Sequence, residues 1–356
     1  MTITGLRPSL VTRLLGGTTS SSTGLPIGRF IGIGIFAILA LIVGLNANVQ
    51  WQASLTLALL SCMGALALNL LMGTAGQVSI GNAGLLAVGG FSTVWFDSIG
   101  IPFPLDLVGS ALVAGLVGLI VGLPALRLRG LYLAIATLAA HFVILFVALQ
   151  YQNAGAGPAG FILKPVFPGK IAQAQSTWLV VVVIAVVLTL LLVGMLMSGK
   201  TGRTWRLIRD HESVVSTFGI NATRWKLSAF VISSIILGVQ GSLFAHYLGA
   251  LSTDSFTLAV AVTYIAMVVL GGLDSLGGAI IGALIISLLP TVVPTLITSV
   301  AGNAVSPTFG AYLSTIIYGG LILVVVVFVP KGIVGSLRAF VVKRAAQSGG
   351  RQGGSE

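Results

Sequence analysis

Charged residues are scarce in this chain. Only 7% of its 356 residues are charged and 56% are apolar, whereas about a quarter of the residues in soluble domains are charged. The mean hydropathy is +1.09, and the apolar runs are too long and too numerous for a soluble core. The alternating segments of about ten residues that mark a transmembrane β-barrel are absent. The composition therefore predicts an all-α integral membrane protein.

Cysteine and clustered histidine are also lacking. Cys62, the one cysteine, lies in an apolar run, which excludes a disulfide framework and favours a small buried hydrophobe. His141 and His246 have no second histidine or carboxylate at ligand spacing, so we expect each to be packed and hydrogen-bonded. No nucleophile, histidine and carboxylate fall together on one aqueous face. We therefore expect no catalytic residue, no metal and no cofactor.

The apolar runs predict ten transmembrane helices, with eight to ten as the range. The first run is longer than a signal-peptide core and lacks a convincing cleavage site, so we interpret it as an uncleaved span. The expected spans are 29–46, 53–72, 84–102, 105–125, 131–150, 178–197, 227–249, 257–273, 276–298 and 311–330. They divide the chain into a flexible N-terminal tail (1–27), a transmembrane domain (28–330) and a basic C-terminal tail (331–356).

Basic residues gather in a few segments. The N-terminal segment and residues 124–130, 198–226 and 331–356 contain all the Lys and Arg residues except Lys164 and Lys170. Cytoplasmic loops carry such an excess of positive charge. Ten spans place all these segments on one side, so we predict that both termini and residues 198–226 are cytoplasmic. The net charge of +11 then reflects membrane topology and not a nucleic acid partner.

Residues 200–226 are the most charged part of the chain, with six of the 18 basic and two of the seven acidic residues. A helical reading gives this segment one apolar face, made of Trp205, Ile208, Val215 and Phe218. The remaining face carries charge, and Arg206 and Asp210 are expected to pair across one turn. Such a segment either docks a soluble partner or is a solvated charge cluster that sets topology.

The end of this segment has turn and cap residues. Gly219 follows the last periodic residue, where a left-handed cap belongs. Asn221 or Thr223 can then cap the helix that returns to the membrane. The sequence thus predicts a short amphipathic helix, a glycine turn and a new span.

A second polar, glycine-rich segment, 73–84, lies between two apolar spans. Its non-helical backbone would be stable at membrane depth only if buried in protein or lining a wet cavity. We therefore interpret Gly76, Gln77, Ser79, Gly81 and Asn82 as candidates for a translocation path. The alternative is close helix packing through small residues, which the Gly118/Gly122 and Gly278/Gly282 pairs suggest elsewhere.

Several ordered blocks resemble the branched-chain amino acid permeases of ATP-binding-cassette (ABC) importers, of the LivM type. The charged segment matches at Gly202-Arg203, Arg209-Asp210-His211-Glu212, Gly219-Ile220-Asn221 and Trp225-Lys226. Further blocks are 68–73, 75–84, 126–132, 134–138, 245–247, 252–256 and 267–273. Val214-Val215-Ser216 replaces the family's Ala-Ala-Glu, and Asn82 stands where members often have His. The resemblance covers roughly residues 50–340.

The resemblance implies a permease subunit in a bacterial cytoplasmic (inner) membrane, with ATP hydrolysis by separate subunits. Its implied partners are two ABC ATPase subunits, a homologous second permease, an external substrate-binding protein and membrane lipid. The residues implied in ATPase coupling are Arg203, Arg206, Arg209, Asp210, Glu212 and Gly219. Urea or short-chain amides are the alternative substrates. An ion-coupled secondary transporter is the alternative class, although such carriers place ionisable residues at the midplane.

Two nucleotide-binding patterns occur in unsuitable surroundings. Residues 194–201 fit the P-loop pattern, but they continue an apolar span instead of joining a strand to a helix. Residues 155–160 fit G-x-G-x-x-G in an external loop without a βαβ unit, and we expect a flexible loop there. Neither pattern predicts an ATP site.

Overall fold

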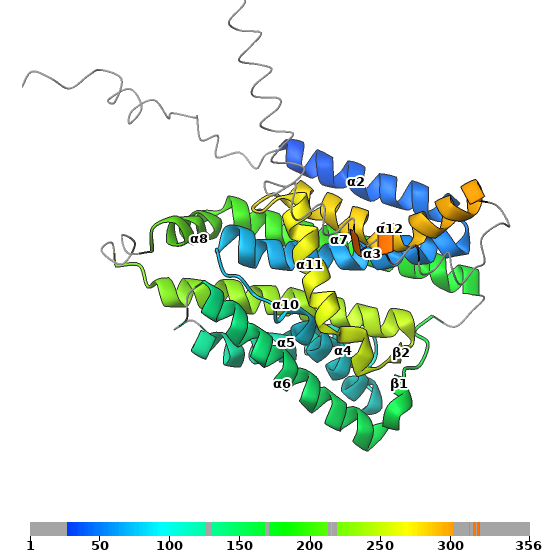
Figure 1. Cartoon of the computed structure of the whole chain (residues 1–356), viewed down its shortest axis with the longest axis horizontal. Helices are drawn as coiled ribbons and strands as arrows, with labels where there is room; N and C mark the ends of the chain where they lie inside the picture. Colours follow the sequence, from blue (N-terminus) through cyan, green and yellow to red (C-terminus); the bar gives the residue numbers. More distant parts are fainter. Residues whose placement is uncertain are drawn as a thin grey trace, which may run out of the picture.

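The computed structural model describes residues 27–125, 128, 130–167, 171–212, 215, 219–301, 313, 316, 317, 319 and 320. Within these residues the protein is almost entirely helical (Figure 1). The helices are α2 (Ile27–Asn46), α3 (Val49–Leu68), α4 (Asn82–Ser98), α5 (Leu105–Ala125), α6 (Leu131–Gly155), α7 (Ile171–Ser198), α8 (Lys200–Asp210), α10 (Ala222–Leu248), α11 (Leu258–Gly271) and α12 (Leu276–Ala301). The short elements are the π-helix η1 (Asn69–Thr74), the 3-10 helices η2 (Gly157–Ala159) and η3 (Thr253–Phe256), and the strands β1 (Phe161–Ile162) and β2 (Ala250–Leu251).

Seven helices among the described residues are long and apolar enough to cross a membrane. They contain α3 with η1, α5, α6, α7, α10, α11 and α12. The predicted spans 29–46 and 84–102 correspond to α2, with an apolar stretch at Gly32–Asn46, and to the 17-residue α4. The predicted span 311–330 lies largely outside the described residues, as do both tails. The all-α membrane fold is therefore confirmed, while ten spans remain a prediction.

Successive long helices alternate in direction, so their connections gather at two ends of the bundle (Figure 1). The α8 end contains η1, the start of α6, α8 and the turn between α11 and α12. Arg206 and Arg209 join α8 to that turn and to η1. The opposite end contains the antiparallel pair of β1 and β2, with Phe161 opposite Leu251. Loop 155–160, predicted to be flexible, forms a turn with η2 that leads into β1.

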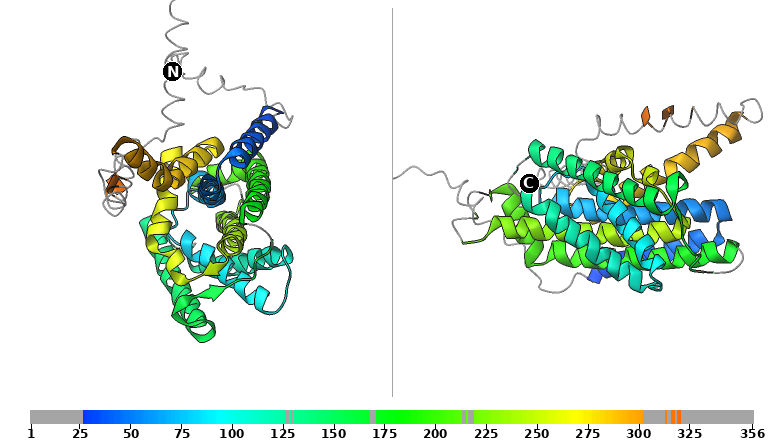
Figure 2. Two further views of the ribbon diagram at one scale, coloured as in Figure 1. Left: turned by 90° about the vertical axis from the view of Figure 1, so that its right-hand side faces the viewer. Right: turned by 90° about the horizontal axis from the view of Figure 1, so that it is seen from below.

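Helix α3 is the centre of the bundle. Seen along the helix axes, it lies among α2, α7, α10, α11 and α12 (Figure 2). Its second half is buried, with Leu66, Ala67 and Leu68 at 0% exposure. Cys62 is also fully buried here, as predicted for a small hydrophobe. Because α3 continues without a break into η1, the central helix connects the core directly to the α8 end.

Close glycine contacts bring α5 against α10 and α12 against α11. A Cβ at Gly118 of α5 would lie 2.5 Å from Ser234 Cβ, and one at Gly122 would lie 2.9 Å from Leu227 Cδ1. In α12, a Cβ at Gly282 would lie 2.8 Å from the Gly271 nitrogen. The predicted packing role of Gly118, Gly122 and Gly282 is therefore confirmed. Such contacts let helix backbones approach where side chains would separate them.

Candidate functional site

Helix α8 begins directly after the span α7, with Gly199 as its N-cap. Trp205 and Ile208 are 1% and 2% exposed and form the apolar face of α8, and Val215, beyond the end of α8, is also fully buried. Trp205 also donates its indole N–H to the Trp225 carbonyl at 2.9 Å, at the start of α10. The α8 helix is therefore fixed to the membrane bundle through one face.

The predicted continuous helix through residue 218 is wrong. Helix α8 ends at Asp210, because the following residue, His211, has non-helical dihedral angles (φ −143°, ψ 60°). Phe218 lies outside the described residues. The P-loop pattern at 194–201 runs from α7 through Gly199 into α8, so it joins two helices and no strand.

The predicted pair between Arg206 and Asp210 is also wrong. The Arg206 guanidinium instead donates from Nε to Asp274 Oδ2 at 2.8 Å and from Nη2 to Asp274 Oδ1 at 3.0 Å. A carboxylate that faces both guanidinium nitrogens satisfies the planar fork of arginine better than a partner on the same helix. This pair connects α8 to the turn between α11 and α12.

Arg209 contacts two parts of the protein: the backbone in and just after η1, and the neighbouring side chain of Asp210. Its Nη1 donates to the carbonyl of Gly73 in η1, and its side chain packs on Gly76. Its Nε donates to Asp210 Oδ1 at 2.9 Å. This hydrogen bond, together with the nearby positive charges, lowers the pKa of the exposed Asp210 carboxyl.

The other predicted coupling residues complete the surface. Arg203 is exposed. Glu212 Oε1 forms an ion pair with Lys226 Nζ at 2.7 Å. Gly219 has φ +73°, which confirms the predicted left-handed turn. Asn221, one of two predicted caps, is the N-cap of α10 and accepts from the Arg224 N–H at 3.1 Å.

Asp274 is a junction that the sequence analysis did not identify. Besides Arg206, it accepts a hydrogen bond from the Thr74 hydroxyl at 3.0 Å, and its own N–H donates to Asn69 Oδ1 at 2.9 Å. Both partners belong to η1, and Asp274 itself has φ +61°, rare for a non-glycine residue. Arg206 and Arg209 of α8, the turn at Asp274 and the π-helix η1 thus form one polar network, which we call the α8 junction.

The path candidates follow η1 directly. Residues 75–81 form an irregular segment before α4 starts at Asn82. Gly76 adopts φ +70° and is exposed at the α8 end, whereas Gln77 and Ser79 are 2% and 1% exposed. Gln77 donates to the Lys226 carbonyl at 2.9 Å. At Gln77 and Ser79 the segment is therefore non-helical chain buried in protein, the condition expected at membrane depth, while Gly76 and Val78 are exposed.

The segment continues inward against α6. The Ile80 N–H donates to Thr137 Oγ1 at 3.0 Å, and a Cβ at Gly81 would lie 2.7 Å from the Thr137 carbonyl oxygen. Asn82 is 1% exposed and neither of its side-chain polar atoms has a partner among the described residues. Sequence analysis did not connect Thr137 or the adjoining His141 with this segment, since their approach depends on packing between separate helices.

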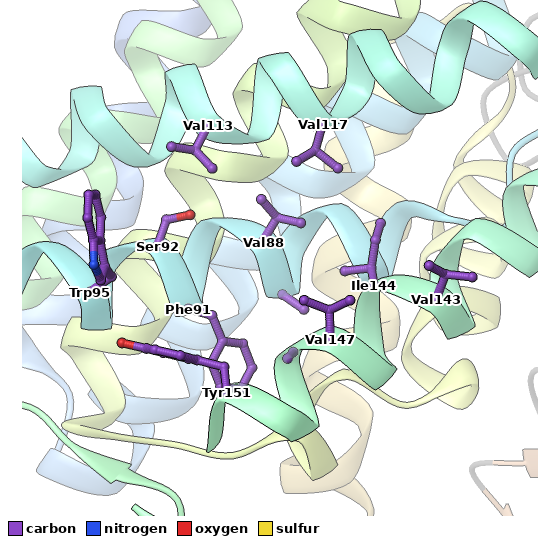
Figure 3. Close-up of a pocket in the computed structure, with 12 residues that line it drawn as sticks. Val88, Phe91, Ser92, Trp95, Val113, Val117, Val143, Ile144, Val147 and Tyr151 are labelled. Carbon is purple, nitrogen blue, oxygen red and sulfur yellow. The ribbon is translucent and has the colours of Figure 1, made fainter. Parts of the chain in front are cut away.

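Two hollows occur in this part of the protein, and one of them is lined by path candidates. A small pocket of about 120 Å³ at the α8 end is lined by Gly76 and Gln77 together with Arg209, Glu212 and Lys226. A larger groove of about 640 Å³ runs over α4 between α5 and α6 (Figure 3). Its lining is apolar apart from Ser92, Trp95 and Tyr151, so this groove offers few polar partners for a charged or zwitterionic molecule.

The opposite end of the bundle contains a buried acid–histidine contact. Asp106, 1% exposed at the start of α5, meets His246 Nε2 near the end of α10. Phe103 packs its ring against the imidazole with centroids 5.4 Å apart. The expectation that His246 is packed and hydrogen-bonded is confirmed. For His141 only the packing is confirmed, since neither ring nitrogen has a partner among the described residues. No group of three metal-ligating side chains occurs among the described residues.

Comparison with known proteins places these features in a family. The family model described as "Branched-chain amino acid transport system / permease component" matches residues 50–326. The high-affinity branched-chain amino acid transport system permease protein LivM of Salmonella typhimurium is 29% identical, covering 81% of this chain and 70% of the relative. LivM of Escherichia coli K12 is also 29% identical, covering 78% and 68%.

An archaeal relative is more distant. The probable branched-chain amino acid transport permease protein LivM of Methanocaldococcus jannaschii is 24% identical over 64% of this chain and 68% of the relative. No solved structure matches the chain significantly. The relatives are transport permeases and not enzymes. The chain belongs to the branched-chain amino acid transport permease family, LivM type.

Proposed function

We propose that this protein is the LivM-type permease subunit of an ATP-driven importer for branched-chain amino acids in a bacterial cytoplasmic membrane. Its partners are two ABC ATPase subunits, a homologous second permease and an external substrate-binding protein. The exposed face of α8, with Arg203 and Asp210, docks an ATPase subunit. Both chain termini and α8 then lie on the cytoplasmic side.

The α8 junction is the observation that carries this proposal. Movement of α8 is transmitted through Arg206 to Asp274 and through Arg209 to Gly73. Gly73 lies in η1, directly before the irregular segment 75–81. A docked ATPase therefore acts on the path segment through direct contacts. Transport then consists of differential stabilisation of two conformations by the partners.

Two classes of substitution separate docking from transmission. Arg203→Glu changes an exposed side chain on α8, so it weakens ATPase binding, which charge complementarity orients. Arg206→Ala removes the Asp274 contact inside the chain, so it leaves docking intact and uncouples ATP hydrolysis from uptake. Lys164→Glu, at the opposite end of the bundle, is the matched charge control.

The experiment uses the complex reconstituted in proteoliposomes with the ATPases, the second permease and the binding protein. The measured quantities are ATPase co-purification, ATP hydrolysis and uptake of radiolabelled leucine, with urea as competitor. We expect the wild-type complex to take up leucine only with ATP, and urea not to inhibit this uptake. Arg203→Glu should no longer co-purify with the ATPase subunits. Arg206→Ala should still co-purify with them but should lose uptake. Uptake that proceeds without ATP or ATPase subunits would contradict it.

A further inference from the structure

The start of α4 is a helix N-terminus without a capping side chain. Gly81 is its N-cap and makes no side-chain cap bond. The helical ladder begins when the Leu85 N–H donates to the Gly81 carbonyl at 3.2 Å. The N–H groups of the first turn, at Asn82, Ala83 and Gly84, precede this bond, and such groups carry partial positive charge directed out of the helix end.

Two buried polar side chains lie at this turn. Asn82 is 1% exposed and His141 is 0% exposed, and none of their four side-chain nitrogen and oxygen atoms has a partner among the described residues. A Cβ at Gly84 would lie 3.2 Å from His141 Nδ1, so the imidazole stands directly against the first turn of α4. Buried polar groups in proteins are nearly always hydrogen-bonded, so an orphaned group requires an explanation.

The position is deep in the bundle. His141 lies ten residues after the start of α6, or about 15 Å along a helix of roughly 37 Å. That is near the middle of a hydrocarbon core of about 30 Å, where polar side chains mark ligand pathways. Within α4 and α6 the one acidic residue is Asp97, about 22 Å from Asn82 along α4. From these two helices, an anion at the first turn therefore meets donors and no nearby carboxylate.

We propose that the first turn of α4, with Asn82 and His141, is a subsite that binds the carboxylate of a transported amino acid. This inference rests on the proposed function and adds the group recognised and the residues that recognise it. The carboxylate accepts hydrogen bonds from the first-turn N–H groups, the Asn82 amide and one imidazole N–H. A broken helix that directs its N-terminus at an anion near the midplane is well suited to this task.

The test measures binding of radiolabelled leucine to the nucleotide-free transporter complex in lipid nanodiscs, without the binding protein. The competitors are 4-methylpentanoate, which has the carboxylate but no amine, and 3-methylbutylamine, which has the amine but no carboxylate. The acid is expected to compete and the amine is not. Equal or better competition by the amine would overturn the subsite, as would an absence of saturable leucine binding.

Variants locate the binding to these residues. Asn82→Asp is nearly isosteric and adds a negative charge, so it should weaken leucine binding at least about tenfold and strengthen amine binding. His141→Leu should weaken leucine about tenfold, and His141→Gln should lose less because it retains a donor. Thr189→Val, a buried position in α7 whose hydroxyl bonds to its own helix, is the control. Complex yield and melting temperature are measured first for each variant.

The outcomes separate this inference from the proposed function. A wild-type complex that imports leucine with ATP, while Asn82→Asp and His141→Leu bind leucine as tightly as wild type, overturns the subsite alone. A wild-type complex that imports no branched-chain amino acid overturns the proposed function.

Discussion

Arg206 and Asp274 lie 68 positions apart in the chain and form a bidentate ion pair that connects α8 to the turn between α11 and α12. The same carboxylate accepts from Thr74 of η1, so one side chain links its own turn to both α8 and η1. About a quarter of the Asp274 side chain and a third of the Arg206 side chain are exposed, at 24% and 32%. The pair is therefore screened in part by water, and its importance lies in geometry more than in stability.

This pair predicts a coupling energy of about 1 kcal/mol in a double-mutant cycle of Arg206→Ala and Asp274→Ala, since both groups are partly exposed. Arg206→Lys should not restore uptake, because an ammonium cannot face both carboxylate oxygens with a planar fork. Unfolding in denaturant measures the coupling energy, and leucine uptake measures the function. If the effects of the two single substitutions on the free energy of unfolding were additive, the pair would have no coupling energy.

Gly219→Val should destabilise the connection between α8 and α10 by roughly 1–2 kcal/mol, because Gly219 has φ +73° and an L side chain is strained there. A Cβ at this position meets no neighbouring atom, so the effect is one of backbone conformation alone. Gly219→Asn is the matched control, because asparagine tolerates left-handed angles. ATP hydrolysis and uptake should fall together in Gly219→Val, with membrane insertion unchanged. Equal behaviour of the two variants would argue against a conformational requirement.

Single cysteines should label from opposite sides of the membrane at the two ends of the bundle. Ile162 in β1 is 88% exposed and Arg203 in α8 is exposed, so Ile162→Cys and Arg203→Cys are both reachable. The background is Cys62→Ala, since Cys62 is the one native cysteine. An impermeant thiol reagent added to intact cells should label position 162 and spare position 203. Labelling of both positions would exclude the proposed orientation.

Disrupting the contact between Asp106 and His246 should be strongly destabilising. Removing one partner leaves a buried polar or charged group uncompensated, at a cost of about 3–5 kcal/mol. His246→Leu and Asp106→Leu should each lower the melting temperature more than the double variant does. Thermal unfolding in detergent measures this, with Asp97→Leu, at a half-buried position near the end of α4, as the control. A double variant as unstable as the sum of the singles would mean that the two side chains do not interact.

Asp210 should remain ionised throughout the usual pH range. Its pKa is lowered in the folded protein by the hydrogen bond from Arg209. Such a group contributes stability above its unfolded pKa, near 3.8, and loses it only as the pH falls toward the folded value. Uptake between pH 5 and 8 should therefore have the same pH profile in Asp210→Asn as in wild type. A pH profile of uptake that is shifted in Asp210→Asn would mean that Asp210 titrates between pH 5 and 8, which would contradict the prediction.

Local patterns predicted much of the fold and part of the site. Apolar runs located the helices, because a span needs about 20 apolar residues. The apolar side of α8 was found through Trp205 and Ile208, and the turn through Gly219, since helical periodicity and left-handed angles leave local signals. The burial of Gln77, Ser79 and Asn82 agrees with their interpretation as a polar segment inside the protein.

Contacts between distant segments could not be predicted in this way. Arg206 had Asp210 within one turn as an available partner, and nothing local indicated that Asp274 would offer both carboxylate oxygens. The π-helix η1 lies inside an apolar run that predicts an ordinary α-helix. His141 had no ligand-spaced neighbour in sequence, and only the packing of α6 on Gly84 places it at the start of α4.

The irregular segment 75–81 also constrains how the protein is made. Polar groups such as the Ile80 N–H and the Gln77 side-chain amide would face hydrocarbon if the preceding and following spans entered the bilayer alone, at a cost of several kcal/mol for each unsatisfied group. Two of its stabilising contacts come from Thr137 in α6 and from the Lys226 carbonyl in α10, both synthesised later. Nascent chains ending before α10 should therefore keep this segment at the translocon or in contact with an insertase. The backbone break at the candidate site thus sets an order for biogenesis.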